Sequence, residues 1–408
     1  MRRRGALRAA AAFVALAVAL GVAAAGQARL STAPLRAQLD RALSTPGVSP
    51  VETGAVVIDL DTGEIVYERN GARPLLPAST EKLAVTVAVL VELGPDYGVG
   101  TDVLGAGVQD GAVWAGDLFL KGYGDPTLRR RDLVSLARQV RSAGIRKVTG
   151  RVLGDESYFD GRRTAPGWKR SFYGEESPPL SALVVDRAAV QGRWVDDPAL
   201  SAAATLGQVL DRAGVRVAGK AGIRAAPPGA VPLAGVVSEP LARMVQRMNR
   251  ESDNFVAEML LKTLGARAGS GGSTAAGVQV VRRVLVELGV PLEGVRLADG
   301  SGLSRGDRLT ASALAALLVA AWNDPELAGP LVESLAVAGV NGTLVGRLDR
   351  RPALGRVFAK TGTTDLASSL AGFVGERYAF AVIMNGRPIP WWSARQAQDR
   401  FVQLLAAQ

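Results

Sequence analysis

The pattern of hydrophobic and polar positions predicts a protein built from both helices and strands. Apolar residues that recur every three or four positions are typical of helices, and alternating or continuous apolar runs of about four to eight residues are typical of strands. The helical pattern covers residues 35–43, 80–93, 130–143, 202–213, 239–248, 255–264, 311–322 and 394–406. The strand pattern covers residues 55–58, 64–68, 103–108, 112–120, 147–153, 357–363, 368–374 and 378–384. Ser238 and Thr310 are predicted to cap the helices that follow them.

The order of these elements predicts one domain that is interrupted by another. Two predicted strands lead into the helical segment 80–93. After it the helical pattern gives way to two further predicted strands, 103–108 and 112–120. The proline- and glycine-containing stretch 225–230 predicts a linker, beyond which helices return. We therefore predict a discontinuous domain of residues 29–94 and 235–408, with an α+β domain inserted at residues 95–234.

The first 28 residues have the pattern of an export signal. Four arginines within residues 2–8 precede an uncharged stretch at 9–25, and Gly26-Gln27-Ala28 offers small residues for cleavage after Ala28. A buried helix is the alternative, but the basic flank and the terminal position favour export. At about 17–20 residues, the stretch is also long enough to remain as a membrane anchor. We expect a signal peptide or N-terminal anchor at 1–28 and a working domain in the cell envelope, whether periplasmic, wall-associated or secreted.

Composition narrows the chemistry that is open to a catalytic serine. The 408 residues include no histidine and no cysteine, which excludes a Ser-His-Asp triad, a thiolate nucleophile and the usual zinc sites. We expect no metal and no cofactor. A hydrolytic serine here needs a lysine or a carboxylate as its base, and the chain has only seven lysines. The net charge of +10 suits an anionic surface such as cell-wall polymer or phospholipid headgroups, and no basic run interleaved with aromatic residues indicates nucleic acid.

Ser79 and Lys82 are the first candidate catalytic pair. Pro77 prevents a helix from running through from upstream, and the helical pattern begins directly after it. A serine and a lysine three positions apart share one face of a helix, about 5–6 Å apart at their Cβ atoms, so a neutral lysine can take the hydroxyl proton. The alternative is that Ser79 only caps the helix and Lys82 extends into solvent. The pair by itself leaves both interpretations open.

Two later segments carry further candidate chemistry. A break between two predicted helices places Ser252 and Asn254 on a short connection, where a hydroxyl and an amide can face one cleft; a plain turn is the alternative. The predicted strand 357–363 contains Lys360 and Gly362. Glycine in a strand often marks the close approach of another backbone, and a substrate peptide that adds to this edge as a strand would satisfy that.

These residues carry a resemblance to a known group of proteins. Ser79-Thr80-Glu81-Lys82, Ser252-Asp253-Asn254 and Lys360-Thr361-Gly362, in this order, resemble the three motifs of penicillin-binding proteins and serine β-lactamases. Segments 248–254 (MNRESDN), 299–305 (DGSGLSR) and 337–344 (VAGVNGTL) are similar to the D-Ala-D-Ala carboxypeptidase/endopeptidase family, the type-4 low-molecular-mass penicillin-binding proteins. The resemblance covers nearly the whole chain after the export segment.

The resemblance implies a fold and one departure from the family pattern. It implies the serine β-lactamase/penicillin-binding-protein-like transpeptidase fold, with an extra domain inserted after the Ser-x-x-Lys helix. Members of this family often carry an insertion of two subdomains there. Only 173 positions separate Ser79 from Ser252, which leaves room for about one, so the contribution of the missing part to substrate binding is in doubt.

The resemblance also implies a role for each motif residue. Ser79 is the nucleophile that forms an acyl-enzyme, and Lys82 is its base, with a pKa lowered by burial beside the second cation Lys360. Ser252 relays a proton to the leaving amine and Asn254 binds the substrate amide. The oxyanion hole is formed by the backbone N–H groups of Ser79 and Thr363. Lys360 attracts the terminal carboxylate of the substrate, and the hydroxyl group of Thr361 or Thr363 binds it. The other predicted substrate-binding residues are Gly362, Asp253 and Ser301.

Three functions remain in competition. The first is a serine-type D-Ala-D-Ala carboxypeptidase, and also an endopeptidase, that acts on peptidoglycan stem peptides and is covalently inhibited by penicillin. The second is a serine β-lactamase, against which the long insertion and the family motifs argue. The third is a non-catalytic protein that binds wall peptides or partners through the inserted domain, against which the intact motifs argue. The sequence leaves open the balance of carboxypeptidase and endopeptidase action, the third residue of the stem peptide, and the oligomeric state.

Overall fold

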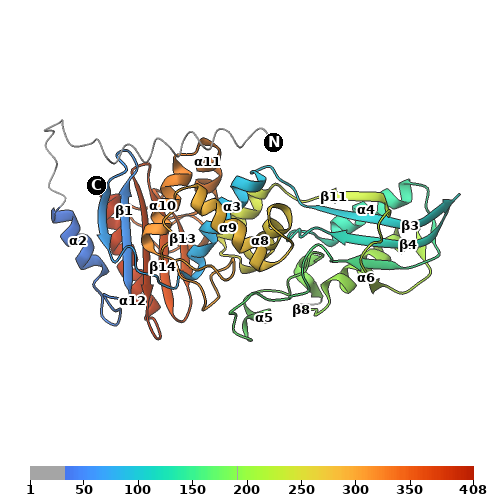
Figure 1. Ribbon diagram of the computed structural model, residues 1–408, viewed down its shortest axis with the longest axis horizontal. Coiled ribbons are helices and arrows are strands. Elements are labelled where there is room, and N and C mark those ends of the chain that lie inside the picture. The colour runs from blue at the N-terminus through green and yellow to red at the C-terminus, as the bar shows by residue number, and fades with distance from the viewer. Residues whose placement is uncertain (1–32, 191) are drawn as a thin grey trace.

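The protein is elongated, with a large mixed domain at one end and the inserted domain at the other (Figure 1). The computed structural model describes residues 33–190 and 192–408. The predicted export segment 1–28 lies outside the described residues. Among the described residues, no helix is both long enough and apolar enough to cross a bilayer.

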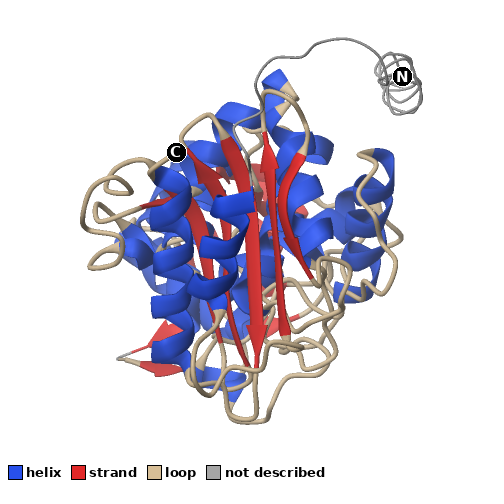
Figure 2. Cartoon of the chain, turned by 90° about the vertical axis from the view of Figure 1, so that its left-hand side faces the viewer, coloured by secondary structure: helices blue, strands red, loops and turns tan. Residues whose placement is uncertain are grey.

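A six-stranded antiparallel sheet forms the centre of the described part of the large domain. The strand order is β12-β13-β14-β15-β1-β2. The bounds of these strands are β1 Thr53–Asp59, β2 Ile65–Arg69, β12 Ala336–Val337, β13 Val357–Thr363, β14 Ala367–Val374 and β15 Tyr378–Asn385. All eight residues of β14 and of β15 are buried, because helices cover both faces of the sheet. On one face lie α2 (Ala33–Leu43) and α12 (Trp391–Ala406), which stand in front of the strands in Figure 2.

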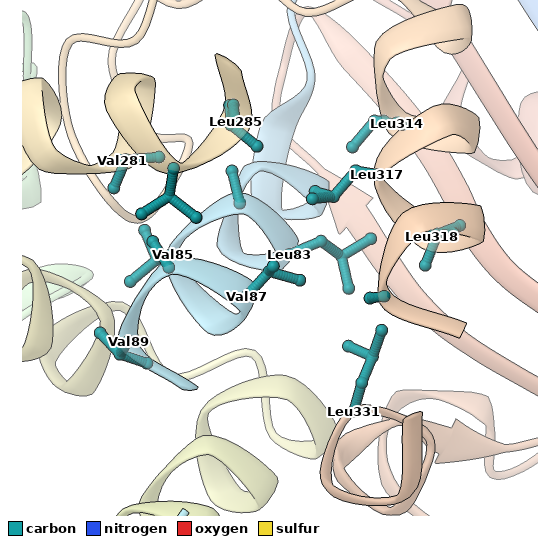
Figure 3. Close-up of a cluster of buried hydrophobic side chains, with 14 of the residues drawn as sticks. Leu83, Val85, Val87, Val89, Val281, Leu285, Leu314, Leu317, Leu318 and Leu331 are labelled. Carbon is teal, nitrogen blue, oxygen red and sulfur yellow. The ribbon is translucent and has the colours of Figure 1, made fainter. Parts of the chain in front are cut away.

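A helical layer covers the opposite face and surrounds α3 (Lys82–Leu93), the helix that follows Ser79. The other helices of this layer are α7 (Leu241–Arg250), α8 (Asn254–Ala268), α9 (Thr274–Glu287), α10 (Ala311–Trp322) and α11 (Pro325–Ser334). Leu83 and Val87 of α3 are almost fully buried against apolar side chains of α9, α10 and α11 (Figure 3). Burying such side chains contributes about 1.5–3 kcal/mol each, so the start of α3, where the reactive residues lie, is held firmly.

The inserted domain has its own sheet and its own core. Its path of strands is β10-β6-β4-β3-β11, with β5 and β9 joined at the side. The bounds are β3 Gly100–Asp110, β4 Val113–Gly122, β5 Lys147–Val148, β6 Val152–Asp155, β9 Arg216–Val217, β10 Gly222–Ile223 and β11 Val231–Val237. Helices α4 (Arg130–Ser142) and α6 (Pro198–Arg212) pack on this sheet. The short elements α5 (Phe172–Glu175), η2 (Asp186–Ala188), β7 (Ala189–Val190) and β8 (Arg193–Trp194) lie on the side nearer the large domain.

Some local predictions fail, each for a physical reason. Ser238 does not cap α7; its hydroxyl accepts a hydrogen bond from Val99 N, and Pro240, in an extended conformation, precedes the first helical residue. The stretch 225–230 joins β10 to β11 of one sheet and is therefore not a linker between domains. Thr310, in contrast, caps α10 as predicted, because its Oγ1 accepts a hydrogen bond from Ala313 N.

Candidate active site

Ser79 lies on a tight turn that is shaped by its neighbours. The 3-10 turn η1 (Ala78–Glu81) precedes α3, and Ala78 has a left-handed φ of 47°, a costly conformation for a residue other than glycine. Gly302 packs directly beneath it: a Cβ at Gly302 would lie 1.9 Å from Ala78 O. The loop that contains Gly302 therefore supports the turn, and only glycine fits there.

Lys82 is buried with its ammonium nitrogen among three fixed acceptors. Its side chain is 0% exposed, and Nζ donates hydrogen bonds to Ser79 Oγ at 2.9 Å, Asn254 Oδ1 at 2.8 Å and Ser301 O at 2.6 Å. The alternative in which Ser79 caps the helix and Lys82 is solvated is wrong. A neutral lysine has two N–H groups and one lone pair. With two carbonyl oxygens taking the two N–H groups, the lone pair faces the Ser79 hydroxyl.

Burial sets the protonation of Lys82. Desolvation lowers its pKa from 10.5 to about 8, while the charges of Asp299 and Glu258 oppose this shift. The predicted lowering of this pKa by burial is therefore confirmed. The pKa of Lys360 also lies well below its ordinary value, first because of burial and then because of the charge of Lys82, so the two buried amines disfavour being charged at the same time. The environment therefore favours the neutral amine by excluding water.

Ser252 and Lys360 form a second serine–lysine pair. Lys360 is 0% exposed, and its Nζ donates hydrogen bonds to Ser252 Oγ at 2.9 Å and to Thr361 O at 2.7 Å. Ser252 lies between α7 and α8 with a left-handed φ of 58°. Such strain persists only where surrounding structure enforces it, and it is common at functional sites. The sequence predicted that these residues belong to one site, and this contact places them together.

Gly362 brings β13 against the Ser79 turn. A Cβ at Gly362 would lie 2.9 Å from Ser79 N and 2.3 Å from Ser369 Oγ. The sequence predicted a close backbone approach, and the closest backbone belongs to the chain itself. Thr361 Oγ1 donates to Thr343 Oγ1 at 2.8 Å, whereas Thr363 is exposed and its Oγ1 accepts a hydrogen bond from Arg395 at 3.1 Å. Sequence reasoning missed Arg395.

Asp253 and Ser301, both predicted to bind substrate, make contacts with other residues of the site. Asp253 Oδ1 caps α8 by accepting a hydrogen bond from Val256 N, and the same carboxylate forms an ion pair with Arg187 at 2.5 Å. Ser301 is 0% exposed; its hydroxyl donates to Asp299 Oδ2 and its carbonyl oxygen holds Lys82. Asp253 therefore fixes the start of α8, and Ser301 fixes the side chain of Lys82.

With this geometry established, comparison with known proteins decides the family. The sequence model of the D-Ala-D-Ala carboxypeptidase 3 (S13) family matches residues 35–194 and 191–408. The chain belongs to this family. The family expected from the three motifs is thereby confirmed.

Relatives in sequence and structure agree with membership in the S13 family. The chain is 32% identical to a D-alanyl-D-alanine carboxypeptidase of Actinomadura sp. (strain R39), across 87% of this chain and 82% of that protein. It is 33% identical to carboxypeptidase DacB of Mycolicibacterium smegmatis, across 86% of this chain and 80% of that protein. The crystal structure of penicillin binding protein 4 (dacB) from Haemophilus influenzae superposes with a TM-score of 0.80 at 24% identity, covering 93% of this chain and 99% of that chain. This likeness confirms the predicted fold.

A cluster of buried carboxyl groups lies behind the site of this S13 protein, and sequence reasoning missed it. Its members are at most 1% exposed: Glu81, Glu258, Asp299 and Asp307. Asp299 is satisfied by donors that include Gly302 N and Ser304 N, whereas the two carboxyl oxygens of Glu81 receive no hydrogen bond from a backbone, hydroxyl or amine group of the described residues. Burial, and then the charges of Asp307 and Asp299, raise the pKa of Glu81 well above its ordinary value. Oxygen atoms of Glu81, Asp299 and Asp307 lie within 4.8 Å of one another. Burial also raises the pKa of Asp307 well above its ordinary value, so these carboxyl groups can share protons.

A strap from the inserted domain, residues 167–177, crosses the site and was also missed. Asn254 Nδ2 donates a hydrogen bond to Glu176 O at 3.1 Å. Trp168 Nε1 donates to Asp299 Oδ2 at 2.7 Å, and Lys169 forms an ion pair with Asp365, just beyond β13. The strap therefore contacts the second motif, the 299–305 loop and the turn after the third motif. No local pattern in 167–177 predicts these contacts, because each of them is made with a segment that lies far away in the sequence.

Proposed function

We propose that this protein is a serine-type D-Ala-D-Ala carboxypeptidase that acts on peptidoglycan stem peptides through an acyl-enzyme on Ser79. The observation that carries the proposal is the placement of Lys82 Nζ, fully buried and 2.9 Å from Ser79 Oγ. Two fixed carbonyl oxygens hold its N–H groups, so its lone pair is directed at the hydroxyl that must lose a proton. The S13 family membership agrees with this chemistry.

The reaction follows from these contacts in two steps. Ser79 Oγ bonds to the carbonyl carbon of the penultimate D-alanine as its proton moves to Lys82. The bond to the terminal D-alanine then breaks, and its nitrogen takes up the proton that Lys82 received, relayed by Ser252, which is hydrogen-bonded to Lys360. In the second step water bonds to the ester carbonyl carbon and gives a proton to Lys82. The bond to Ser79 Oγ breaks, Oγ takes that proton back from Lys82, and the shortened peptide is released. Splitting hydrolysis in this way replaces one difficult step by two easier ones.

The open part of β13 is the proposed substrate edge. The short strand β12 pairs only with Phe358 and Ala359, so a substrate strand can add alongside the later residues of β13. We propose that the terminal carboxylate binds Thr363 and Arg395. The Arg395 Nε is buried and has no hydrogen-bond partner among the described residues, whereas Lys360 is enclosed and engaged with Ser252. Arginine suits a carboxylate because its planar fork can bind both oxygens.

Penicillin is the proposed covalent inhibitor. A structure of the H. influenzae penicillin binding protein 4 is complexed with a β-lactam, and a predatory endopeptidase of Bdellovibrio bacteriovorus is recorded in a penicillin G acylated form. The strained β-lactam ring would present its carbonyl carbon to Ser79 in place of the peptide. We extend the proposal to endopeptidase action, since the same acyl-enzyme forms when the leaving amine belongs to a cross-link.

The test compares the wild type with Ser79→Ala by intact mass after incubation with penicillin, together with D-alanine release from a peptide ending in D-Ala-D-Ala. We expect one penicilloyl adduct and D-alanine release for the wild type only. An adduct on both proteins, or on neither, contradicts the assignment. Loss of the wild-type adduct within seconds identifies a β-lactamase instead.

The place of action is part of the proposal. We propose that residues 1–28 direct export and either are cleaved or anchor the protein, so that the enzyme works in the cell envelope. The four arginines and the uncharged stretch at 9–25 support this. Fractionation of cells that express the full chain, followed by mass determination of the mature N-terminus, tests it. Recovery of the intact chain from the cytosol contradicts the proposal.

A further inference from the structure

An arginine of the inserted domain holds the second motif of the active site. Arg187 Nη1 donates a hydrogen bond to Asp253 Oδ2 at 2.5 Å, and Arg187 Nη2 donates one to Asp253 Oδ1 at 3.2 Å. Two arms of one guanidinium group therefore bind both oxygens of the carboxylate, a geometry that fixes the orientation of both partners. Asp253 lies between Ser252 and Asn254, so a group that fixes Asp253 also restrains its two neighbours.

The large domain shelters this ion pair from water. The side chain of Asp253 is 9% exposed, and the guanidinium carbon of Arg187 lies 4.9 Å from the ring centroid of Phe255, a fully buried residue in the first turn of α8. A partly buried ion pair is screened by water and salt much less than an exposed one. The contact is therefore strong enough to hold the start of α8 and the connection before it in one position.

The backbone that carries Arg187 is held in an unusual shape. Asp186, Arg187 and Ala188 of η2 have left-handed φ angles of 48°, 58° and 57°, although none of them is glycine. Such residues are costly and persist only where the surrounding structure enforces them, which is common at functional sites. Asp186 N donates a hydrogen bond to Leu128 O at 2.9 Å. Val195 N donates one to Ala188 O at 3.0 Å, so the turn presents its arginine from a fixed base in the inserted domain.

The neighbours of Asp253 are the residues that contact the two buried lysines. Ser252 Oγ accepts a hydrogen bond from Lys360 at 2.9 Å, and Asn254 Oδ1 accepts one from Lys82 at 2.8 Å. Asp253 itself makes neither contact. A shift of the connection between α7 and α8 would lengthen both hydrogen bonds, and a displacement of about 1 Å in an active site can cost about a hundredfold in rate.

We propose that Arg187 is a positioning residue for the acylation of Ser79. Its guanidinium group holds Asp253, and Asp253 in turn keeps the hydroxyl of Ser252 and the amide of Asn254 in place. This inference rests on the proposed function and gives the inserted domain a part in the chemistry. Because Arg187 acts only through Asp253, its loss should slow the chemical step and leave the affinity for the reacting molecule nearly unchanged. A purely structural contact would change the stability alone.

The test measures acylation by a fluorescent penicillin as a function of its concentration, which separates the rate constant at saturation from the half-saturating concentration. Arg187→Gln should lower the saturating rate constant about tenfold to a hundredfold, with little change in the half-saturating concentration. Arg187→Lys keeps the charge but lacks the planar fork, so it should restore part of the rate. Arg193→Gln, the same charge change at an exposed position of β8 in the inserted domain, is the control and should leave the rate unchanged.

A double-mutant cycle tests whether Arg187 acts through Asp253. Asp253→Asn should slow acylation to a similar extent. Adding Arg187→Gln to Asp253→Asn should then change the rate constant by less than about twofold, because residues that act as one unit are not additive. If each substitution multiplies the loss caused by the other, Arg187 acts by another route and the inference is overturned.

The amount of adduct separates positioning from folding. The final yield of adduct counts the folded molecules, whereas the rate constant reports how well each folded molecule is arranged. A lower yield with an unchanged rate constant for Arg187→Gln would assign the residue a structural role and overturn the inference, as would an unchanged yield and rate. The absence of an adduct on the wild type would instead defeat the proposed function. An adduct on the wild type, combined with a slower rate at full yield for Arg187→Gln, supports both.

Discussion

Asn254 offers a direct way to change the pKa of Lys82. Its Oδ1 accepts a hydrogen bond from Lys82 Nζ at 2.8 Å, and Asn254→Asp would place a carboxylate oxygen at the same point with almost no change in size. An opposite charge at this distance favours the ammonium form. Such a neighbour typically moves a pKa by about one to three, so the pKa of Lys82 should rise from about 8 into the range of roughly 9 to 11.

The magnitude follows from the population of the neutral amine. Acylation requires Lys82 without its proton, so the rate rises with pH up to the pKa and then becomes constant. At pH 7 a pKa of about 8 leaves roughly one amine in eleven neutral, whereas a pKa of roughly 9 to 11 leaves one in a hundred to one in ten thousand. The variant should therefore acylate roughly ten to a thousand times more slowly at pH 7 and recover as the pH rises.

The assay is the second-order rate constant for acylation of Ser79 by a fluorescent penicillin, measured from pH 6 to pH 10 for the wild type, Asn254→Asp and Asn254→Ala. The wild-type midpoint is expected near pH 8, and the aspartate variant should have a higher one. Asn254→Ala removes the amide without adding charge, so it should lower the plateau without moving the midpoint upward. Equal midpoints for the wild type and the aspartate variant would refute the reasoning, as would a wild-type rate that is constant between pH 6 and pH 9.

Three further predictions concern the supports of the site. Gly362→Ala should reduce penicillin acylation at least about tenfold and lower the free energy of unfolding by about 1–3 kcal/mol, because its methyl group would collide with Ser369 Oγ and Ser79 N; acylation kinetics and denaturant unfolding measure this. Asp253→Asn should keep the helix cap but lose the ion pair with Arg187, so Asp253→Ala should be less stable than Asp253→Asn by about 1 kcal/mol, the usual value of a cap. Glu81→Gln should raise the melting temperature, and more at pH 8 than at pH 5. The folded protein holds a proton on Glu81 that the unfolded chain releases above its ordinary pKa of 4.5, so the carboxyl group destabilises the fold increasingly as the pH rises.

Each of these predictions has an outcome that would contradict it. Wild-type acylation by Gly362→Ala would mean that β13 does not press against the turn. Equal stability of Asp253→Ala and Asp253→Asn would show that the side chain of residue 253 does not stabilise α8 as an N-cap. A stabilisation by Glu81→Gln that is the same at pH 5 and pH 8 would mean that Glu81 does not hold a proton in the fold; Glu287→Gln, on the exposed end of α9, is the control for a general charge effect.

Local rules predicted many of the elements and failed where a neighbour in space took over. Thr310 caps α10 because an N-cap hydroxyl acts within its own turn. Ser238 has the same local features, but Val99 N takes its hydroxyl oxygen, and Val99 lies far away in the sequence. The predicted strand 147–153 is two short strands, β5 and β6. Both of them pair with β4, a partner that no pattern within 147–153 specifies.

The sequence by itself determined the family and the fold class, through the three motifs in their order. It placed Ser79 and Lys82 on one face at a helix start, because a spacing of three positions brings side chains to the same face. It also determined that any base here is a lysine or a carboxylate, since the chain has no histidine. Only the tertiary structure decided why Lys82 can be neutral. The carbonyl oxygens that hold it come from Asn254 and Ser301, and the pKa of a buried amine depends on the water excluded and on every charge around it. Those quantities are sums over residues that folding brings together from distant parts of the chain, so no local pattern contains them.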